Sequence, residues 1–260
     1  MRQITEIKEL RQIQLSIMDD IHQFCEQKGI RYSLAGGTLI GAFRHKGYIP
    51  WDDDIDIYLM RADYERFIRE YQDPTGRFFL LSPQHTAHYF YTFAKVVDMR
   101  TVMQEDETKG FEIGVYVDVF PLDYVTDNLR FRRYVFWWKH FLYKVRRCKM
   151  SNGQFLDSWL ANFVYKYLPV PVSSIDWVIE RYIHRRKPTG TICEMCETER
   201  PLRGCYSADA FKSTIDVTFE GRVYQSMVGY DEYLTNTYGN YMQIPPVDQQ
   251  IQHKFKAYWK

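Results

Sequence analysis

Four aspartates stand close together early in the chain, in the segment WDDDIDI that starts at Trp51. They are Asp52, Asp53, Asp54 and Asp56. Neighbouring carboxylates repel one another, and this repulsion costs free energy unless a positive group lies among them. Mg²⁺ prefers oxygen ligands, and proteins usually hold it with one or two carboxylates together with substrate phosphates. The crowding therefore indicates divalent-metal chemistry on a phosphorylated substrate.

The aspartates also follow the period of a β-strand. In DDIDIYL the acidic and apolar residues alternate, and successive side chains of a strand point to opposite faces. We expect Asp54 and Asp56 to share one face of the strand, with Asp52 on the same side just before the strand begins. Asp53 should point away from them. The alternative is a solvated acidic strand edge that resists pairing with another chain.

A second acidic strand favours the metal interpretation. YVDVF, residues 116–120, places Asp118 between apolar neighbours. An isolated carboxylate in such a strand is costly to bury unless it is paired or bound to a metal. We therefore predict that Asp54, Asp56 and Asp118 converge on one metal site, with Asp52 as a further candidate ligand.

Glycines and bases near the aspartates are typical of a phosphate site. A Gly-Gly pair follows the strand-like IRYSLA and opens the helix-like TLIGAFR. Glycines at such a position let backbone N–H groups approach a phosphate at a helix N-terminus. Lys95 lies in a later strand, where it is a candidate charge partner for a phosphate or for the aspartates; a simple ion pair is the alternative. The candidate phosphate-binding residues are Gly36, Gly37, Thr38, Arg44, His45, Lys46 and Lys95.

The spacing of apolar residues predicts the elements that must position these side chains. The predicted strands cover residues 30–35, 53–59, 78–82, 91–98 and 114–123, and the predicted helices cover 4–28, 127–149, 154–168 and 173–186. Residues 188–222 are predicted to be irregular. This order predicts an α/β (α+β) fold, in which a mixed-sheet core with flanking helices precedes a largely helical C-terminal part. We expect the core to cover residues 1–125 and a helical acceptor-side region to cover 126–260, packed as one unit with the core.

Composition narrows the class of protein. The chain has 260 residues, 45% of them hydrophobic and 26% charged, as in ordinary soluble globular proteins. Its formal net charge of +1 argues against a nucleic-acid partner, which would require a basic excess. No apolar run approaches the roughly 18–20 residues that span a bilayer, and the N-terminus has no secretion signal. Five cysteines, an odd number, indicate a reducing compartment. We expect a cytoplasmic protein, with the inner face of the membrane as a further location.

Two weaker patterns leave alternatives open. Cys193, Cys196 and Cys205 match part of a structural Zn²⁺ site, for which His184 or Cys148 would supply the fourth ligand, or they are ordinary buried thiols. The segment 131–150 mixes eight bases with a broad aromatic face. Such a helix can lie peripherally on an anionic membrane, or it can be a core helix with a solvated basic face.

The quoted motifs together resemble a known family. GGTLIGAFRHKGYIPWDDDIDI resembles the signature of the LicD family, whose members include bacterial phosphocholine transferases; fukutin and fukutin-related protein belong to the same wider group. VYVDVFPLD is similar to the second acidic strand of that family. FEG at 219–221, and YLTNTYGNYMQIPP followed by His253, resemble its C-terminal motif.

The resemblance implies a nucleotidyltransferase-like core and a metal-dependent reaction that uses Mg²⁺ or Mn²⁺. By position, Asp54, Asp56 and Asp118 would be the catalytic and metal-binding carboxylates, and Asp118 would also accept the acceptor proton. Gly36 and Arg44 are among the residues that would line the donor phosphates. His253 would contact the donor or acceptor phosphates.

The predicted activity is therefore transfer of a phosphorylated small group, such as phosphocholine, from a CDP-linked donor. The acceptor would be a hydroxyl of a cell-surface glycan, such as teichoic acid or lipopolysaccharide, or of its lipid-linked precursor. One alternative is a nucleotidyltransferase that releases pyrophosphate from a nucleoside triphosphate. The other is a non-catalytic module that binds nucleotides or glycans.

Overall fold

A computed structural model describes most of the chain. The described residues are 1–104, 113–150, 163–164, 166–167, 169–184, 187–196, 204–250 and 256–260. They fall into two compact units, of which the first comprises residues 1–121 and 209–260 and the second residues 122–208.

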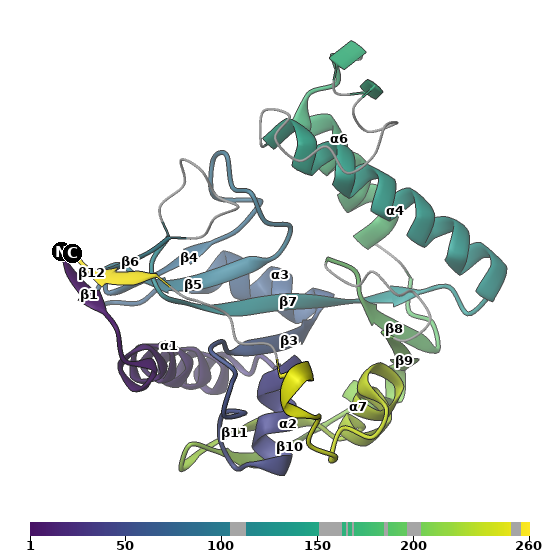
Figure 1. Ribbon diagram of the computed structural model, residues 1–260. Coiled ribbons are helices and arrows are strands. Elements are labelled where there is room, and N and C mark those ends of the chain that lie inside the picture. Colours follow the sequence, from purple (N-terminus) through teal and green to yellow (C-terminus); the bar gives the residue numbers. More distant parts are fainter. Residues whose placement is uncertain are drawn as a thin grey trace. The chain divides into compact units, whose positions relative to one another are not determined.

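The first unit contains a mixed sheet, a hairpin and a small three-stranded sheet (Figure 1). Its strands are β1 (Arg2–Ile4), β2 (Ser33–Leu34), β3 (Asp56–Met60), β4 (Phe78–Leu81), β5 (Ala94–Asp98), β6 (Thr101–Met103), the first part of β7 (Tyr116–Val125), β10 (Thr214–Phe219), β11 (Arg222–Met227) and β12 (Ala257–Trp259). Its helices are α1 (Ile7–Lys28), α2 (Gly36–Arg44), α3 (Arg61–Glu70), α7 (Tyr230–Tyr238) and the 3₁₀ turns η2 (Ala208–Phe211) and η3 (Val247–Gln249).

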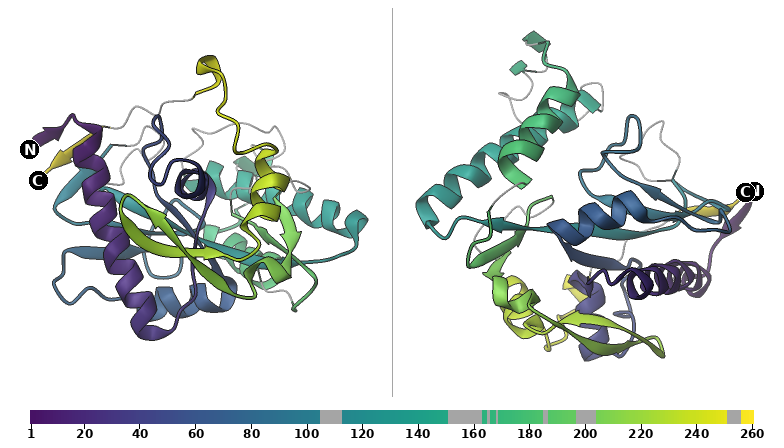
Figure 2. Two further views of the ribbon diagram at one scale, coloured as in Figure 1. Left: turned by 90° about the horizontal axis from the view of Figure 1, so that it is seen from below. Right: turned by 180° about the vertical axis from the view of Figure 1, so that it is seen from behind.

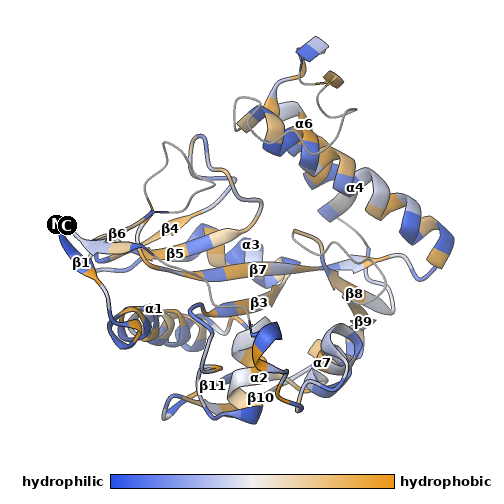
Figure 3. Cartoon of the chain, in the orientation of Figure 1, coloured by the Kyte–Doolittle hydropathy of each residue, from blue (hydrophilic) through white to orange (hydrophobic). Residues whose placement is uncertain are grey.

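The main sheet of this unit has the strand order β2-β3-β7-β5-β4, which places the two predicted acidic strands side by side. Alternation decides which side chains are buried: Ile57 and Leu59 of β3 are fully buried, whereas Asp56 and Tyr58 are half-buried. Figure 3 shows the hydrophobic residues along these strands. β1 pairs with β12, so the two ends of the chain lie side by side (Figure 2).

Helix α1 confirms the predicted N-terminal helix, although it begins at Ile7 rather than at residue 4, and Ile4 lies in strand β1. Its buried stripe follows the spacing of three and four residues that a core-facing helix requires, and includes Leu10, Ile13, Ile17 and Ile21. The helix ends at Gly29, which adopts the left-handed conformation with φ of 60°. That conformation favours glycine because a side chain would be strained there.

The second unit has its own core. Its elements are the second part of β7, α4 (Leu129–Met150), α6 (Val172–Val178), the π-helical turn η1 (Ile179–His184), β8 (Thr191–Glu194) and β9 (Cys205–Ser207). The end of β7 pairs with β8, and β8 pairs with β9. Buried side chains from all these elements form the core, namely Val125, Val135, Phe136, Val145, Ile175, Ile179, Cys193, Met195 and Cys205. In the part of the chain that the structure describes, no helix is both long and apolar enough to cross a bilayer.

The mixed α/β class is confirmed, but the expectation of a largely helical C-terminal part is wrong, because β8 to β12 lie in it. The segment predicted to be irregular, residues 188–222, contains β8, β9 and the first strand and turn of the hairpin β10–β11. Its sequence TIDVTF alternates as a strand does, and Glu220 and Gly221, with φ of 51° and 73°, form the tight turn. A turn with two positive φ values matches the twist of a hairpin, although Asn-Gly is the usual sequence.

Two expectations about organisation stay open. Most of the predicted helix at 154–168 lies outside the described residues. The division at residue 125 stays a prediction, and the compact units group residues 209–260 with the first part of the chain.

Asp98 at the end of β5 should make the stability of the first unit depend on pH. Burial alone would raise the pKa of this fully buried carboxyl, but hydrogen bonds from Arg100 and Arg77, at 2.8 and 3.0 Å, hold the pKa below its ordinary value. A lowered native pKa stabilises the fold above the unfolded value of about 3.9, and the stabilisation is lost as pH falls below it.

We therefore expect Asp98→Asn to reduce the free energy of unfolding near neutral pH and to flatten its decrease towards acid. Urea denaturation over an acidic pH series measures this. Asp216→Asn, at an exposed position on β10, is the control. An unchanged acid dependence in Asp98→Asn would contradict the assignment.

Candidate functional site

Helix α1 fixes the backbone of the aspartate segment. Arg11 donates hydrogen bonds from Nη2 to the carbonyl oxygens of Ile49 and Asp52, at 3.1 and 2.6 Å. One turn later, Gln14 donates from Nε2 to the carbonyl of Asp53 at 2.7 Å. Each bond satisfies a main-chain acceptor that lies outside regular structure. The entry to β3 is therefore anchored through its main chain.

The N-terminus of α2 lies against two of these carboxylates. A Cβ atom added to Gly36 would come within 2.9 Å of Asp56 Oδ2, and one added to Gly37 would overlap the carboxylate of Asp52. Gly36 also has a φ of 52°, which a side chain would strain. The positive end of a helix stabilises negative charge. The Gly-Gly pair therefore lets the helix terminus approach carboxylates, and its predicted contact with donor phosphates stays a prediction.

Thr38 joins this helix to the strand. Its buried side chain accepts a hydrogen bond at Oγ1 from the backbone N–H of Asp56, at 3.0 Å. The bond fixes the start of β3 relative to α2. Thr38 was predicted to bind phosphate; the structure gives its hydroxyl a positioning contact.

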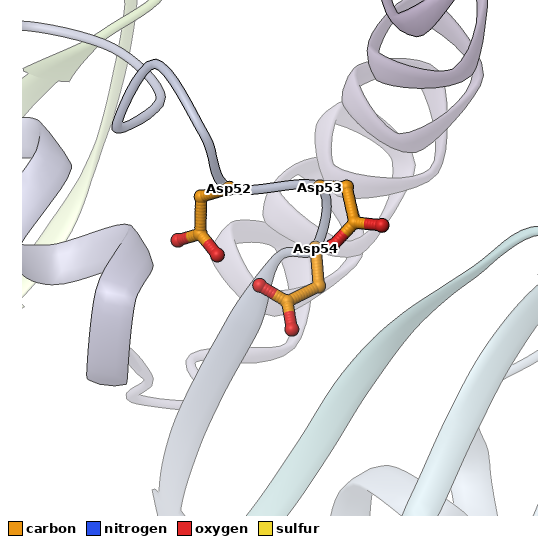
Figure 4. A group of neighbouring side chains, drawn as sticks. All are labelled: Asp52, Asp53 and Asp54. Carbon is orange, nitrogen blue, oxygen red and sulfur yellow. The ribbon is translucent and has the colours of Figure 1, made fainter. Parts of the chain in front are cut away.

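Three consecutive aspartates bring their oxygens together. Asp52, Asp53 and Asp54 each offer one carboxylate oxygen, and these three atoms lie within 4.8 Å of one another (Figure 4). Among the described residues this is the only group of three or more His, Cys, Asp or Glu side chains that meets that distance. Carboxylate oxygens are ligands for hard divalent cations, so this group could hold a metal ion. Asp53, which was expected to point away, is part of the group.

The second acidic strand lies next to this segment and presents Asp118 on the same face. The backbone N–H of Asp118 donates to the carbonyl of Ile55 at 2.9 Å. Two residues further along each strand, the rings of Tyr58 and Phe120 meet edge to face at 6.1 Å. Because alternate residues of a strand share a face, Asp56 and Asp118 lie on one side of the sheet. Neither joins the group within 4.8 Å, so their role as metal ligands stays a prediction.

Lys95 is the partner of Asp118. The two residues lie opposite each other on β5 and β7, and Lys95 Nζ is 2.6 Å from Asp118 Oδ1. Lys95 is 2% exposed, and its ammonium lies 3.4 Å from the centre of the Tyr116 ring and 4.4 Å from that of Tyr91. The ion pair that sequence offered as the alternative for Lys95 is therefore present, on one of the predicted catalytic aspartates.

Tyrosines from α7 complete the surroundings of the α2 terminus. The hydroxyl of Tyr233 accepts a hydrogen bond from Gly36 N–H at 3.2 Å and donates to the hydroxyl of Tyr58 at 3.3 Å. Tyr238 is 48% exposed, and the neighbouring Tyr233 and the charges of Asp56 and Asp52 raise its pKa well above the ordinary value. Tyr238 therefore stays a neutral hydroxyl beside the carboxylates. Tyr233 was missed as a site residue and Tyr238 was left open between stacking on a substrate and closing the core, although the motif YLTNTYG that contains both was recognised.

The predicted basic residues have mostly structural contacts. Arg44 donates from Nη1 to the carbonyls of Tyr241 and Gln243, at 2.5 and 3.1 Å, which ties α2 to the segment after α7. Burial and the charge of Arg44 lower the pKa of His45, so the neutral ring is favoured there. Lys46 is exposed. A role for these three in binding donor phosphates stays a prediction, and His253 lies outside the described residues.

The β10–β11 turn supports the loop that leads into the aspartates. The N–H of Glu220 donates to the carbonyl of Lys46 at 2.9 Å, and Oε1 of Glu220 accepts from Tyr48 N–H at 3.0 Å. A side chain on Gly47 would collide with Glu220. A positive φ is uncommon for glutamate and costs free energy, so these contacts must hold the turn in place. Arg11 gave no local sequence signal, and Glu220 was noted only as part of the FEG motif, because the contacts of both residues span a long sequence separation.

The cysteine cluster does not assemble as a complete zinc site in the described residues. Cys193 and Cys205 are opposite each other on β8 and β9, but the thiols of Cys193, Cys196 and Cys205 do not form a group within 4.8 Å. His184 has both ring nitrogens within hydrogen-bonding distance of other side chains, at 2.8 Å from Tyr143 and 3.3 Å from Glu180. Zinc binding stays a prediction.

A sheet with aspartates gathered at a helix N-terminus defines a candidate centre for metal-dependent phosphoryl transfer, and comparison with known proteins agrees with this class. A family profile described as "LicD/FKTN/FKRP, nucleotidyltransferase domain" matches residues 29–173. The chain belongs to the LicD family, as its motifs predicted, and is a LicD-type phospho-group transferase.

Relatives differ in how much of the chain they match. The chain is 32% identical to the lipopolysaccharide cholinephosphotransferase LicD of Haemophilus influenzae, over 97% of both proteins. It is 50% identical to the human ribitol 5-phosphate transferase FKRP over 38 residues, which are 15% of this chain and 8% of that protein.

Removing the Glu220 carboxylate should loosen the loop before the aspartates and weaken divalent-ion binding. We expect Glu220→Ala to reduce Mn²⁺ affinity by about tenfold, the lower end of the effect of removing an outer support of a metal site. Glu220→Gln keeps an oxygen that can accept from Tyr48 N–H and should bind nearly as the parent protein does. Isothermal titration calorimetry measures both, and equal affinities for the two variants would contradict this role.

Replacing Lys95 should leave a buried carboxylate without its cation. We expect Lys95→Met to lower the free energy of unfolding by about 3–5 kcal/mol, the usual cost of breaking a buried ion pair. The double variant Lys95→Met/Asp118→Asn removes the charge that was left behind and should recover part of this loss. Urea denaturation measures the three proteins, and a double variant no more stable than Lys95→Met would argue against the pairing.

Proposed function

We propose that this protein transfers phosphocholine from CDP-choline to a hydroxyl of a lipopolysaccharide glycan, with Mg²⁺ or Mn²⁺ at the aspartate segment. The observation that carries the metal-dependent reaction is the group of three carboxylates beside the N-terminus of α2. The transferred group and the acceptor are supported by the relative whose name is lipopolysaccharide cholinephosphotransferase and which matches 97% of the chain. The CDP-linked donor is the one that the family resemblance implies. A lipid-linked glycan precursor is an acceptor of the same chemistry.

The residues of this chain suit the reaction in distinct ways. A divalent ion held by Asp52, Asp53 and Asp54 would neutralise charge on the donor diphosphate and on the departing CMP. Arg11 and Gln14 keep the carboxylates in place through the main chain. The acceptor oxygen attacks the phosphorus of phosphocholine, the bond from that phosphorus to CMP breaks, and the acceptor loses its proton.

Asp118 is the proposed acceptor of that proton. A base must be ionised when the substrate arrives, and the adjacent ammonium of Lys95, 2.6 Å away, favours the ionised carboxylate. The same contact orients the Asp118 side chain.

A nucleotidyltransferase that releases pyrophosphate is the second candidate function. It is favoured by the description of the matching family as a nucleotidyltransferase domain. The products distinguish the two reactions, since a CDP-linked donor yields CMP and a nucleoside triphosphate yields pyrophosphate.

The activity test is CMP release from CDP-choline in the presence of Mg²⁺ and a lipopolysaccharide acceptor. Mutating a residue that supports the ligands of a metal site lowers metal affinity or activity by about 10- to 100-fold. Asp54→Asn removes a proposed ligand itself, so we expect it to lower the rate of CMP release by at least about 100-fold. The variant should remain folded by circular dichroism. Pyrophosphate release from CTP with no CMP from CDP-choline would overturn the proposal in favour of the second candidate.

A pair of variants separates the two possible ligand sets. Asp53 belongs only to the group of three consecutive aspartates in the structure. Asp118 belongs only to the ligand set predicted from the family motif, and Asp54 belongs to both sets. If the consecutive aspartates hold the ion, Asp53→Asn lowers Mn²⁺ affinity and Asp118→Asn lowers turnover while affinity is kept. Asp216→Asn on β10 is the control. If instead Asp118→Asn lowers Mn²⁺ affinity and Asp53→Asn does not, Asp118 rather than Asp53 is a ligand of the ion.

A further inference from the structure

Helix α4 of the second unit has two different sides. Its buried residues, which include Val135, Phe136 and Val145, pack into the core of the unit. The first half of the helix also exposes large apolar side chains. They are Leu129, Phe131, Tyr134, Trp137 and Trp138, with exposed fractions of 47%, 47%, 55%, 56% and 37%. Hydrophobic residues therefore occupy both the core side and the solvent side of the same helix turns.

The exposed rings are neighbours of one another. Phe131 stacks on Tyr134 at 6.1 Å between ring centres, and Tyr134 meets Trp138 edge to face at 6.2 Å. Trp137 contacts Trp138 at 5.0 Å and stacks on Phe141 at 6.1 Å. Single exposed apolar residues are normal, but a continuous patch marks an interaction site. We call the exposed set Leu129, Phe131, Tyr134, Trp137 and Trp138, together with Arg130 and Arg133, the α4 patch.

Charge on this helix has one sign. α4 carries eight lysines and arginines and no acidic residue, whereas the whole chain has a formal net charge of +1. Arg130 and Arg133 are exposed between the aromatic residues, and Figure 3 shows hydrophilic and hydrophobic residues interleaved along the helix. The patch therefore offers cations and aromatic rings to the same partner.

We propose that the α4 patch docks on the surface of an anionic lipid bilayer. Tryptophan and tyrosine favour the headgroup region, where one end of the ring is apolar and the other is hydrated. Arginine and lysine are attracted by anionic headgroups, each by roughly 1 kcal/mol near the surface. A nucleic acid would match the charge but not the apolar patch, and a second copy would bring the same positive charge to the contact. The proposal concerns where the protein acts and is independent of which donor it uses.

Vesicle co-sedimentation of the full chain tests this. We expect the protein to pellet with vesicles of phosphatidylglycerol and phosphatidylcholine in low salt, and to stay in solution with vesicles of phosphatidylcholine alone. Arg130→Glu/Arg133→Glu should weaken binding to the anionic vesicles at least about tenfold, given the contribution of each base. Trp137→Ala/Trp138→Ala should weaken it comparably, because the rings enter the headgroup region.

Matched controls alter equivalent residues elsewhere. Lys8→Glu/Lys28→Glu makes the same charge change at exposed positions of α1, and Phe79→Ala removes a ring that is 53% exposed on β4. Both should bind as the parent protein does, and circular dichroism checks that all variants are folded.

Three results would overturn the proposal. The first is no preference for anionic vesicles, and the second is equal binding by the α4 variants and the controls. The third is a dimer in sedimentation velocity that the Trp137→Ala/Trp138→Ala variant abolishes, which would assign the patch to a second copy of the chain.

Discussion

Repulsion among the aspartates that follow Trp51 is the constraint on which the candidate site depends. The fold places the positive end of a helix beside the carboxylates. The N-terminus of α2 approaches Asp52 and Asp56 because Gly36 and Gly37 have no side chains, and the positive end of a helix offsets negative charge. In the proposed function a divalent ion would neutralise further charge of the aspartate group. A carboxylate cluster that needs an external cation is suited to phosphoryl transfer, because the phosphate groups of the donor need the same cation.

Distant parts of the chain converge on this short segment. Arg11 of α1 bonds to its carbonyls, the turn at Glu220 supports the loop before it, and Tyr233 of α7 bonds to the first glycine of α2. The sheet brings Asp118 to the same face and gives it Lys95 as its partner. The first unit thus fixes the backbone of the site by hydrogen bonds and leaves the carboxylates to determine its chemistry. Similarity to a cholinephosphotransferase over nearly the whole chain agrees with such a role.

Local patterns predicted what is local in this molecule. The apolar spacing of α1 and the alternation in β3 and β7 were sufficient to predict these elements, and the family motif located the aspartates. The features that the sequence did not predict depend on contacts between residues far apart in the chain. Nothing near Arg11 or Glu220 indicates their bonds, and Asp53 was assigned away from its neighbours because the strand was assumed to begin earlier than Asp56. The hairpin β10–β11 was missed because Glu-Gly is an unusual sequence for its turn.

The most direct test of the account is a crystal structure of the protein with Mn²⁺ and CDP-choline, read by the anomalous scattering of manganese. The account predicts a manganese peak bound by oxygens of the aspartate segment beside Gly36 and Gly37, with the donor diphosphate on its open side. A peak bound elsewhere, or a donor bound away from these carboxylates, would contradict it.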